Sequence, residues 1–274
     1  MTWNEYCISK LPLAKSLYKR CMKQEWDFTN PKTFTEKLWW LKIYDSTMLK
    51  TFCADKITCH DYYCMKLGKD TSIPIIKVYD SAKDIKWDEL PDRFVIKCNH
   101  GSGYNIIVKN KNTIDKKCIA DRLNAWMNED YAFKYDVELH YHLIPHKILI
   151  EQYVDDLQDV KVFCFNGQVK FFQADYHLTQ HRQNFYDDNW NYMQWLSRKD
   201  YPSNPSVRDA KPINFDKIKE WATLLSKDFK FVRVDLFETS NGNLYTGELT
   251  FTPGGGRQHY KEDGDIKLGK MLSI

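Results

Sequence analysis

The sequence contains no apolar stretch that could cross a membrane. A spanning helix needs about 18 or more consecutive apolar residues, and no run in the chain approaches that length. Residues 1–17 include Glu5 and only a short apolar patch, which is not the pattern of a secretory signal peptide. We therefore expect a cytoplasmic protein without an integral membrane segment.

Cysteine pairs at metal-binding or redox spacing are also lacking. The eight cysteines include no C-x-x-C pair and no zinc-finger spacing. Cys98 and Cys164 lie inside apolar, strand-like runs, where a thiol acts as a small hydrophobic group. Reduced cysteines of this kind are typical of a cytoplasmic protein. Lysine and arginine are dispersed and the net charge is only +3, which does not favour a nucleic-acid partner.

The chain does contain a helical pattern followed by a strand pattern, which predicts an α+β fold. We expect a mostly helical segment over residues 1–88 and a body of two lobes, 89–153 and 154–274. The expected strands are 75–79, 93–97, 105–109, 147–154, 159–165, 168–176, 231–237 and 243–251. The expected body helices are 114–127, 215–228 and a final helix after residues 253–256.

The N-terminal segment predicts three helices. Residues 1–50 read as two helices with a break at Asn30-Pro31. The second of these begins with a capping box, in which Thr33 and Glu36 satisfy each other's free amides. A third helix is expected from Asp55 to Leu67, closed by a glycine.

Two acidic residues on neighbouring strands form a candidate metal site. Asp235 and Glu248 lie on strands joined at Asn241-Gly242, and period two allows both side chains to share one face. Two adjacent carboxylates repel each other unless a cation lies between them. A hard divalent ion such as Mg²⁺, held also by phosphates, suits these ligands. The alternative is a solvent-facing hairpin with ordinary acidic residues.

Three further features could handle a nucleotide. Lys97 ends a strand just before the glycine-containing loop 99–103, where backbone amides and a positive charge could contact phosphate. Glu151 lies in an otherwise apolar strand and could anchor a ribose hydroxyl. The dipeptide Asp55-Lys56 opens an expected helix. Each pattern also occurs in ordinary surface hairpins, strands or helices, so only their order along the chain is informative.

In that order, these features resemble the ATP-grasp superfamily. More narrowly, stretches 90–103, 160–167, 231–235 and 247–254 look like the TupA-like ATP-grasp family. The resemblance implies an ATP-grasp fold whose two lobes clamp ATP. It also implies a place in teichuronopeptide, capsule or O-antigen synthesis, with glycosyltransferases as possible partners.

The resemblance further implies roles for the matching residues. Arg233 and Lys97 would be catalytic, and Asp235 and Glu248 would hold Mg²⁺. Thr250 stands where the superfamily usually has asparagine, and its hydroxyl would be a weaker metal ligand. ATP would be bound by Lys56, Lys97, Asn99, His100, Gly101, Ser102, Gly103, Glu151, Gln152, Tyr153, Asp156 and Lys161, with Asp155 as an alternative to Asp156 for the ribose.

The implied activity is that of an amide-forming ligase dependent on ATP and Mg²⁺. A carboxylate, on a uronic acid or an amino acid, would attack the γ-phosphate, and an amine would capture the acyl phosphate. Two alternatives remain open: an ATP-grasp kinase of a sugar hydroxyl, and a non-catalytic nucleotide-binding subunit of the same machinery.

Two other patterns invite interpretation. His140, His142 and His146 have the spacing H-x-H-x₃-H, which could indicate a metal site, but they fall in a connector that we expect to be exposed. Residues 177–213 lack clear periodicity and carry Trp190, Tyr192 and other aromatic residues. This segment could recognise a sugar by ring stacking or form a lid packed on its own aromatic side chains.

Overall fold

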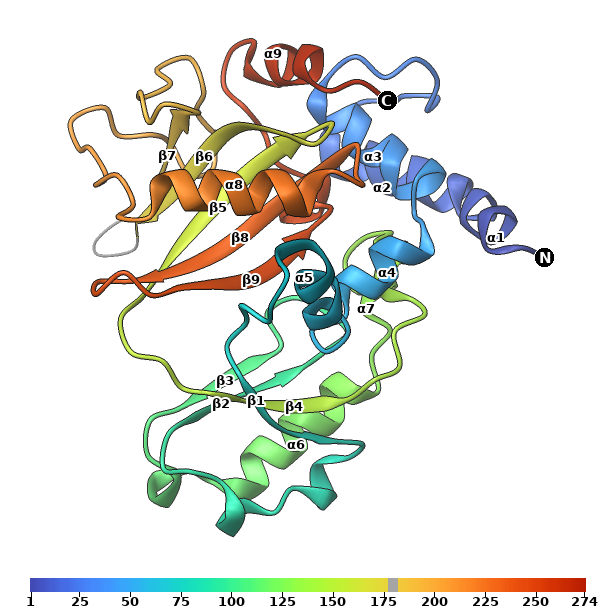
Figure 1. The fold of residues 1–274 in the computed structure, drawn as a ribbon. Helices are drawn as coiled ribbons and strands as arrows, with labels where there is room; N and C mark the ends of the chain where they lie inside the picture. Colours follow the sequence, from blue (N-terminus) through green and yellow to red (C-terminus); the bar gives the residue numbers. More distant parts are fainter. Residues whose placement is uncertain (177–181) are drawn as a thin grey trace.

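The computed structural model describes residues 1–176 and 182–274, which form two lobes, each built on one antiparallel sheet (Figure 1). In the order of their pairing, the smaller sheet contains β1 (Ile75–Tyr79), β4 (Ile148–Gln152), β2 (Phe94–Cys98) and β3 (Asn105–Val108). The larger sheet contains, in the same sense, β7 (Arg182–Asp187), β6 (Gln168–Tyr176), β5 (Leu157–Phe165), β8 (Phe231–Thr239) and β9 (Leu244–Thr250). This is the α+β arrangement that the sequence predicts.

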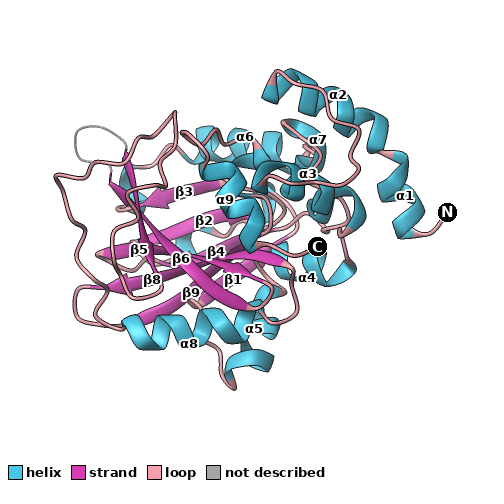
Figure 2. Ribbon diagram, turned by 90° about the horizontal axis from the view of Figure 1, so that it is seen from above, coloured by secondary structure: helices cyan, strands magenta, loops and turns pink. Residues whose placement is uncertain are grey.

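The helices flank the two sheets. The N-terminal helices lie along one side of the molecule, and the two sheets overlap when seen from above (Figures 1 and 2). Helix α6 packs against the smaller sheet and α8 against the larger one. The α-helices are α1 (Trp3–Ser9), α2 (Leu11–Met22), α3 (Phe34–Tyr44), α4 (Met48–Ala54), α5 (Cys59–Leu67), α6 (Lys116–Met127), α7 (Tyr131–Lys134), α8 (Phe215–Ser226) and α9 (Gly264–Met271). Short 3₁₀ turns occur at Ala82–Asp84, Trp87–Glu89, Lys111–Thr113, Leu139–Tyr141 and Pro253–Gly256.

The larger sheet separates apolar from charged side chains by strand alternation. On β8, Val232, Val234 and Leu236 are buried in the core that also contains the apolar residues of α8. Successive side chains of a strand point to opposite faces, so Arg233 and Asp235 project to the other side. The pairing of β5 with β8 places Lys161 directly opposite Asp235. Burial of one face therefore fixes the direction in which the charged residues point.

The N-terminal region contains more helices than expected. The break at Asn30-Pro31 and the capping box of Thr33 and Glu36 are both confirmed. Residues 1–50 nevertheless contain α1, α2, α3 and the start of α4 rather than two helices. Phe34 at the start of α3 stacks on Phe165 of the larger sheet, with 5.3 Å between ring centroids, so tertiary packing ties this helix to the body.

The helix expected from Asp55 begins later. Asp55 is the C-terminal cap of α4 with an extended backbone, and α5 begins only at Cys59. The Asp55 side chain accepts a hydrogen bond from the Ile57 amide at 2.9 Å, a local turn that competes with helix formation. Gly68 closes α5 in the left-handed conformation, as the sequence predicts.

Two chain segments connect the lobes, and they lie side by side. In the first, Ser72 forms a parallel bridge with Thr246 of β9, and a few residues later Ile75 pairs with Glu151 of β4. The second segment runs from the end of β4 to the start of β5. The Gln152 amide donates to the Pro74 carbonyl at 3.0 Å, which joins the two crossings.

The predicted hairpin at Asn166-Gly167 is confirmed, with both residues at positive φ, as a two-residue hairpin loop requires. Residues 188–213 lack a long helix or strand.

Asn214 occupies the N-cap position of α8 but makes no side-chain cap. Its amide instead donates to Glu238 Oε1 at 2.9 Å and to the Gly242 carbonyl at 2.8 Å, because these acceptors on the β8–β9 hairpin lie within reach.

Candidate active site

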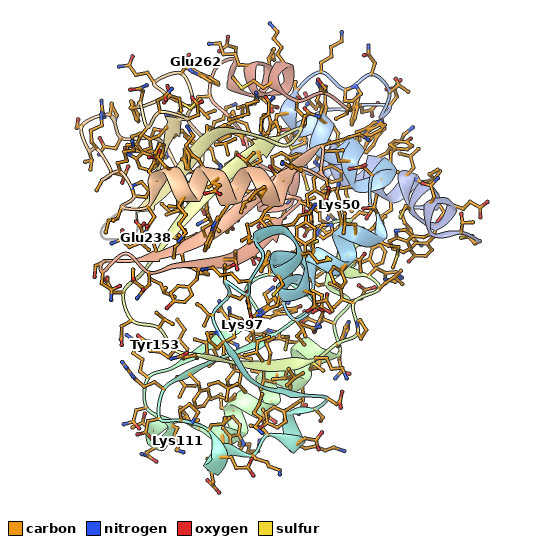
Figure 3. The ribbon with its side chains drawn as sticks, viewed as in Figure 1. Lys50, Lys97, Lys111, Tyr153, Glu238 and Glu262 are labelled. Atoms are coloured by element: carbon orange, nitrogen blue, oxygen red, sulfur yellow. The ribbon has the colours of Figure 1, made fainter. Side chains whose placement is uncertain are left out.

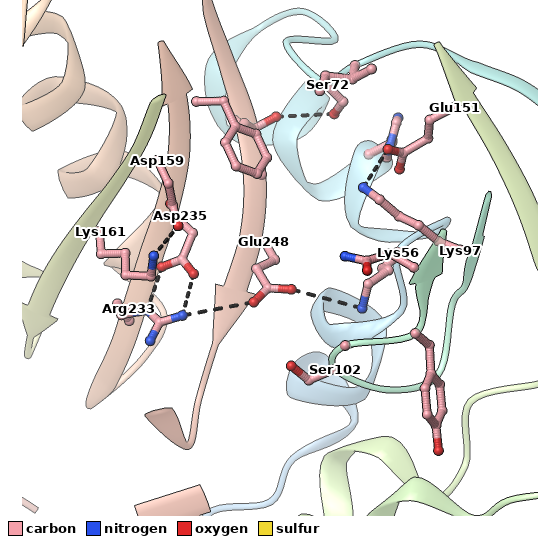
Figure 4. Close-up of a pocket in the computed structure, with 18 residues that line it drawn as sticks. Lys56, Ser72, Lys97, Ser102, Glu151, Asp159, Lys161, Arg233, Asp235 and Glu248 are labelled. Atoms are coloured by element: carbon pink, nitrogen blue, oxygen red, sulfur yellow. Dashed lines mark hydrogen bonds and ion pairs between the residues drawn. The ribbon is translucent and has the colours of Figure 1, made fainter. Parts of the chain in front are cut away.

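A cleft of about 350 Å³ lies between the two sheets. The smaller lobe and the α4–α5 turn supply one wall, and the exposed face of the larger sheet supplies the other (Figure 4). Figure 3 labels Lys97 in this region between the sheets. The cleft is lined by the charged residues Lys56, Lys97, Glu151, Asp159, Lys161, Arg233, Asp235 and Glu248.

Every one of the four lysine and arginine side chains in this lining lies beside a carboxylate. Lys97 Nζ is 2.5 Å from Glu151 Oε2 on the same wall. On the opposite wall Lys161 forms an ion pair with Asp159, and its Nζ lies 2.7 Å from Asp175 Oδ2. Burial would lower the pKa of the Lys161 ammonium, but the surrounding aspartates raise it above its ordinary value. Lys161 therefore stays charged in the cleft.

Arg233 lies beside two acidic residues of the β8–β9 hairpin, Asp235 and Glu248. Its Nε donates to Asp235 Oδ1 at 2.6 Å, and its Nη2 forms a second bond to the same carboxylate and lies 3.9 Å from Glu248 Oε1. Burial raises the pKa of Asp235, and the Arg233 charge opposes that shift. Partial burial would also raise the pKa of Glu248, but Lys56, Arg233 and Lys97 together hold it below its ordinary value.

The oxygen atoms of this hairpin fit a hard divalent cation. Asp235 and Glu248 are directly paired in the β8–β9 register. Thr250 Oγ1 lies 3.2 Å from Glu248 Oε1 and 3.4 Å from Asp235 Oδ2. Neighbouring ligands of an octahedral Mg²⁺ ion with bonds of about 2.1 Å are separated by roughly 3 Å. The donor set contains only oxygen, which suits Mg²⁺ better than a softer metal.

Lys56 connects the two walls. It lies in the turn between α4 and α5, and its Nζ donates to the Gly101 carbonyl at 2.5 Å. The same Nζ is 4.0 Å from Glu248 Oε2 across the cleft (Figure 4). The Lys56 ammonium group therefore lies close to both the glycine-containing loop and Glu248, one of the candidate metal ligands.

The loop 99–103 is divided between the cleft and the protein interior. Ser102 and Gly103 line the cleft and are exposed. Asn99 and His100 are fully buried beneath them. His100 stacks on His146 at 3.6 Å between ring centroids and shares a hydrogen bond with the Trp126 carbonyl. Gly101 is also buried, and an added Cβ would lie 2.6 Å from the Tyr131 ring.

The predicted residues that directly follow Glu151, namely Gln152, Tyr153, Asp155 and Asp156, do not line the cleft. Gln152 uses its amide to join the two lobe crossings. The Tyr153 ring lies under the Arg93 guanidinium at 4.8 Å, and Arg93 also pairs with Asp155 at 2.9 Å. Asp156 has a positive φ, and its Oδ2 accepts from the Ser240 amide at 3.3 Å. Glu151 is therefore the one member of this predicted group that faces the cleft.

Several residues of the lining are not among those that the sequence predicts. Asp159 precedes Lys161 by two on β5, so strand period was a sufficient signal for it, and Phe237 follows Asp235 in the same way. Ser72 and Ile73 come from the lobe crossing. No local pattern indicates that they reach the cleft.

The histidine pattern does not form a metal site. Against our expectation of exposure, His140 is 3% exposed and packs against Phe251. His142 shares hydrogen bonds with Tyr6 and Asp130, and His146 stacks on His100. Within residues 1–176 and 182–274, no three histidine, cysteine or acidic side chains form a group that could hold a metal ion.

The aromatic residues of 188–213 contact their own surroundings. Trp190 stacks on Tyr186 at 4.4 Å, and Tyr192 lies under Arg208 at 4.3 Å. These contacts favour the interpretation of a segment packed on its own aromatic side chains. Residues 177–181 of the predicted segment lie outside the described part of the chain.

Two antiparallel sheets that enclose a cleft lined with lysines, an arginine and an acidic hairpin define an ATP-grasp fold. The family model described as TupA-like ATPgrasp matches residues 36–273, and the chain belongs to this family. No curated protein sequence matches the chain. No helix in the described ranges is long and apolar enough to pass through a bilayer.

Solved structures share the fold at low sequence identity. The L-amino acid ligase from Bacillus licheniformis matches with a TM-score of 0.50 and 12% identity, over 90% of this chain and 56% of that one. The D-alanine–D-alanine ligase from Bacillus anthracis complexed with ATP matches with a TM-score of 0.43 and 16% identity, over 73% and 55%. The N5-carboxyaminoimidazole synthetase from Staphylococcus aureus gives 0.42 and 16%, over 73% and 44%. The chain thus spans about half the length of these proteins.

Proposed function

We propose that the protein binds Mg-ATP in this cleft and uses it to activate a carboxylate, which an amine then captures as an amide. The observation that carries the proposal is the meeting, in one cleft, of four cationic side chains with two carboxylates that a threonine hydroxyl contacts. Lys56, Lys97, Lys161 and Arg233 provide the positive charge, and Asp235, Glu248 and Thr250 provide the oxygen ligands.

The lining supports a direction for the nucleotide. Ile73 and Phe237 add apolar surface to the lining, which suits a base, and Glu151 in the same lining is the candidate acceptor for a ribose hydroxyl. Lys56, Lys97 and the exposed tip Ser102-Gly103 suit the phosphates, because ammonium groups and backbone amides neutralise phosphate oxygens. The γ-phosphate would then lie near Arg233.

The chemistry follows from that placement. A carboxylate oxygen of the substrate attacks the γ-phosphorus, the bond to the β-phosphate oxygen breaks, and ADP leaves. The amine nitrogen next attacks the acyl carbon, inorganic phosphate leaves, and the amine proton passes to the departing phosphate. Arg233 would stabilise the negative charge that develops on the transferred group. Bound Mg²⁺, held by Asp235, Glu248 and Thr250, would neutralise phosphate charge.

For the substrates, we propose a uronic acid or an amino acid carboxylate of a bacterial surface polysaccharide, together with an amine. This part rests on the family resemblance and not on a contact in the cleft. A cytoplasmic enzyme that works beside glycosyltransferases is consistent with it.

The test is an assay for the activated acid. The protein is incubated with Mg-ATP, a panel of free or nucleotide-linked uronic acids and amino acids, and hydroxylamine. We expect ADP, inorganic phosphate and a hydroxamate, because an acyl phosphate is electrophilic at carbon. Phosphate retained on a sugar hydroxyl without hydroxamate from any acid would overturn the ligase proposal in favour of the kinase. Tight Mg-ATP binding without turnover on any acid would favour the non-catalytic subunit.

A further inference from the structure

Lys56 lines the cleft but does not lie in a helix or a strand. It lies between α4, which ends at Ala54, and α5, which begins at Cys59. A lysine side chain on such a turn has many rotamers, and fixing them costs conformational entropy. The turn itself must therefore be held if the ammonium group is to stay directed at the cleft.

Asn99 provides that support from the neighbouring loop. Its Nδ2 donates to Asp55 Oδ1 at 2.9 Å and to the Pro145 carbonyl at 3.0 Å, and its Oδ1 accepts from the Lys147 amide at 2.8 Å. The main chain adds a further bond, because the Lys56 amide donates to the Asn99 carbonyl at 3.3 Å. Asn99 thus binds the residue before Lys56 and Lys56 itself.

The Asn99–Asp55 contact is buried. Asn99 is 0% exposed and Asp55 is 7% exposed. Asp55 Oδ1 also accepts from the Ile57 amide, so one carboxylate closes the turn around Lys56 on both sides. Loss of the Asn99 amide would leave a buried carboxylate with fewer donors, and this unfavourable state favours a rearrangement of the turn.

The held lysine then contacts both parts of the candidate site. Its Nζ bonds to the Gly101 carbonyl at 2.5 Å, two residues after Asn99, and it lies 4.0 Å from Glu248. The Asp55-Lys56 turn and the loop 99–103, which are distant in sequence, therefore form one hydrogen-bonded unit.

We propose that Asn99 and Asp55 are positioning residues that act through Lys56, and that Asn99 is not itself a ligand of the nucleotide. The proposal rests on the proposed function, because it assumes that Lys56 contacts the phosphates of ATP. It assigns Asn99 a part in ATP affinity without direct contact.

A double-mutant cycle on Mg-ATP affinity tests this. Calorimetric dissociation constants are measured for wild type, Asn99→Ala, Lys56→Met and the double variant at a temperature where all are folded. We expect Lys56→Met to weaken binding about 100-fold and Asn99→Ala about tenfold. If Asn99 acts through Lys56, adding Asn99→Ala to Lys56→Met changes the constant less than about twofold.

A matched control separates this effect from general destabilisation. Asn184 is also 0% exposed, and its side chain also makes three hydrogen bonds, to Val207, Asp209 and Asn204. Asn184→Ala should lower the melting temperature to a similar degree and leave Mg-ATP affinity unchanged. If Asn99→Ala does not fold, Asp55→Asn, which preserves volume, takes its place in the cycle.

The outcomes are distinct. Independent, additive losses in affinity for Asn99→Ala and Lys56→Met would overturn the positioning role. A wild-type protein that binds no Mg-ATP would instead overturn the proposed function, and an unchanged affinity for Lys56→Met would remove Lys56 from the nucleotide site.

Discussion

Arg233 and Asp235 lie two residues apart on strand β8 and meet side to side, with Arg233 Nε 2.6 Å from Asp235 Oδ1 and a second bond from Nη2. Both are almost excluded from solvent, with side-chain exposures of 11% and 5%. A guanidinium in this position orients the carboxylate, and it can also turn to a transferred phosphate. The Asp235 carboxylate is therefore already paired with a positive charge within its own strand.

The hairpin carboxylates give the first prediction. Glu248→Gln and Asp235→Asn should each abolish turnover and leave the fold intact, because each removes one negative charge without changing volume. The measurements are hydroxamate formation and melting temperature over a range of Mg²⁺ concentrations. Near-normal rates at saturating Mg²⁺ for both variants would contradict the metal assignment.

The second prediction concerns Thr250, whose hydroxyl lies between the two carboxylates. Thr250→Asn should lower the Mg²⁺ concentration needed for half-maximal rate, because an amide oxygen is a stronger ligand than a hydroxyl. Activity should survive, and Thr250→Val, which keeps the shape but lacks the oxygen, should raise that concentration. An inactive but folded asparagine variant would instead indicate a packing or substrate role.

Lys97 gives the third prediction. Lys97→Met should weaken Mg-ATP binding about 100-fold, because a phosphate loses a direct ionic partner. The matched control is Lys147→Met, which removes an exposed ion pair with Asp80 on the same lobe and should leave affinity unchanged. Equal affinities for wild type and Lys97→Met, measured by calorimetry, would exclude Lys97 from the site.

The buried histidine beneath the loop predicts a pH dependence of stability. Burial, assisted by His146, lowers the pKa of His100 from 6.5 to about 4. Between these values the unfolded chain binds a proton that the native chain does not, so His100 makes the free energy of unfolding fall as pH decreases. His100→Asn should remove up to about 1.4 kcal/mol per pH unit from that slope. The free energy of unfolding is measured for wild type and His100→Asn by urea titration at pH 7, 6 and 5. The same slope against pH for both proteins would refute this prediction.

The triple-glycine turn after β9 gives a fifth prediction. Gly255 has φ +64, and an added Cβ would lie 2.9 Å from Asp136 Oδ2. Gly68 has φ +76 with nothing within 4 Å. Gly68→Ala should cost about 1 kcal/mol of stability for the backbone conformation alone. Gly255→Ala should cost about 2 kcal/mol more because of the clash, and equal melting temperatures for the two variants would rule out the steric part.

The features that the sequence predicts well are local or periodic. The capping box at Thr33, the turn at Asn166-Gly167 and the shared face of Asp235 and Glu248 each follow from spacing along a few residues. The contact of Lys97 with Glu151 was not predicted, because it joins two strands that are far apart in sequence.

The loop 99–103 also depends on contacts that the local sequence does not predict. Its glycines indicate a phosphate-binding loop, but no local pattern indicates that Asn99 and His100 point inward. Their direction is set by Asp55, Trp126 and His146, which come from three other parts of the chain. The start of α5 was misjudged for a related reason, because Asp55 is engaged in the turn instead of the first helical position.

The pairing of every lysine and arginine of the cleft with a carboxylate has a consequence for how an anion can enter. The four cations Lys56, Lys97, Lys161 and Arg233 line the cleft with the four carboxylates of Glu151, Asp159, Asp235 and Glu248, so these groups create little net field. A free triphosphate that bound the four cations would displace their carboxylate partners. Those carboxylates would then lie close to the negative charge of the triphosphate. If the protein binds Mg-ATP as proposed, a nucleotide that carries its own divalent counterion would satisfy the cations and the carboxylates at once, so we expect the cleft to bind the magnesium salt in preference to the bare anion.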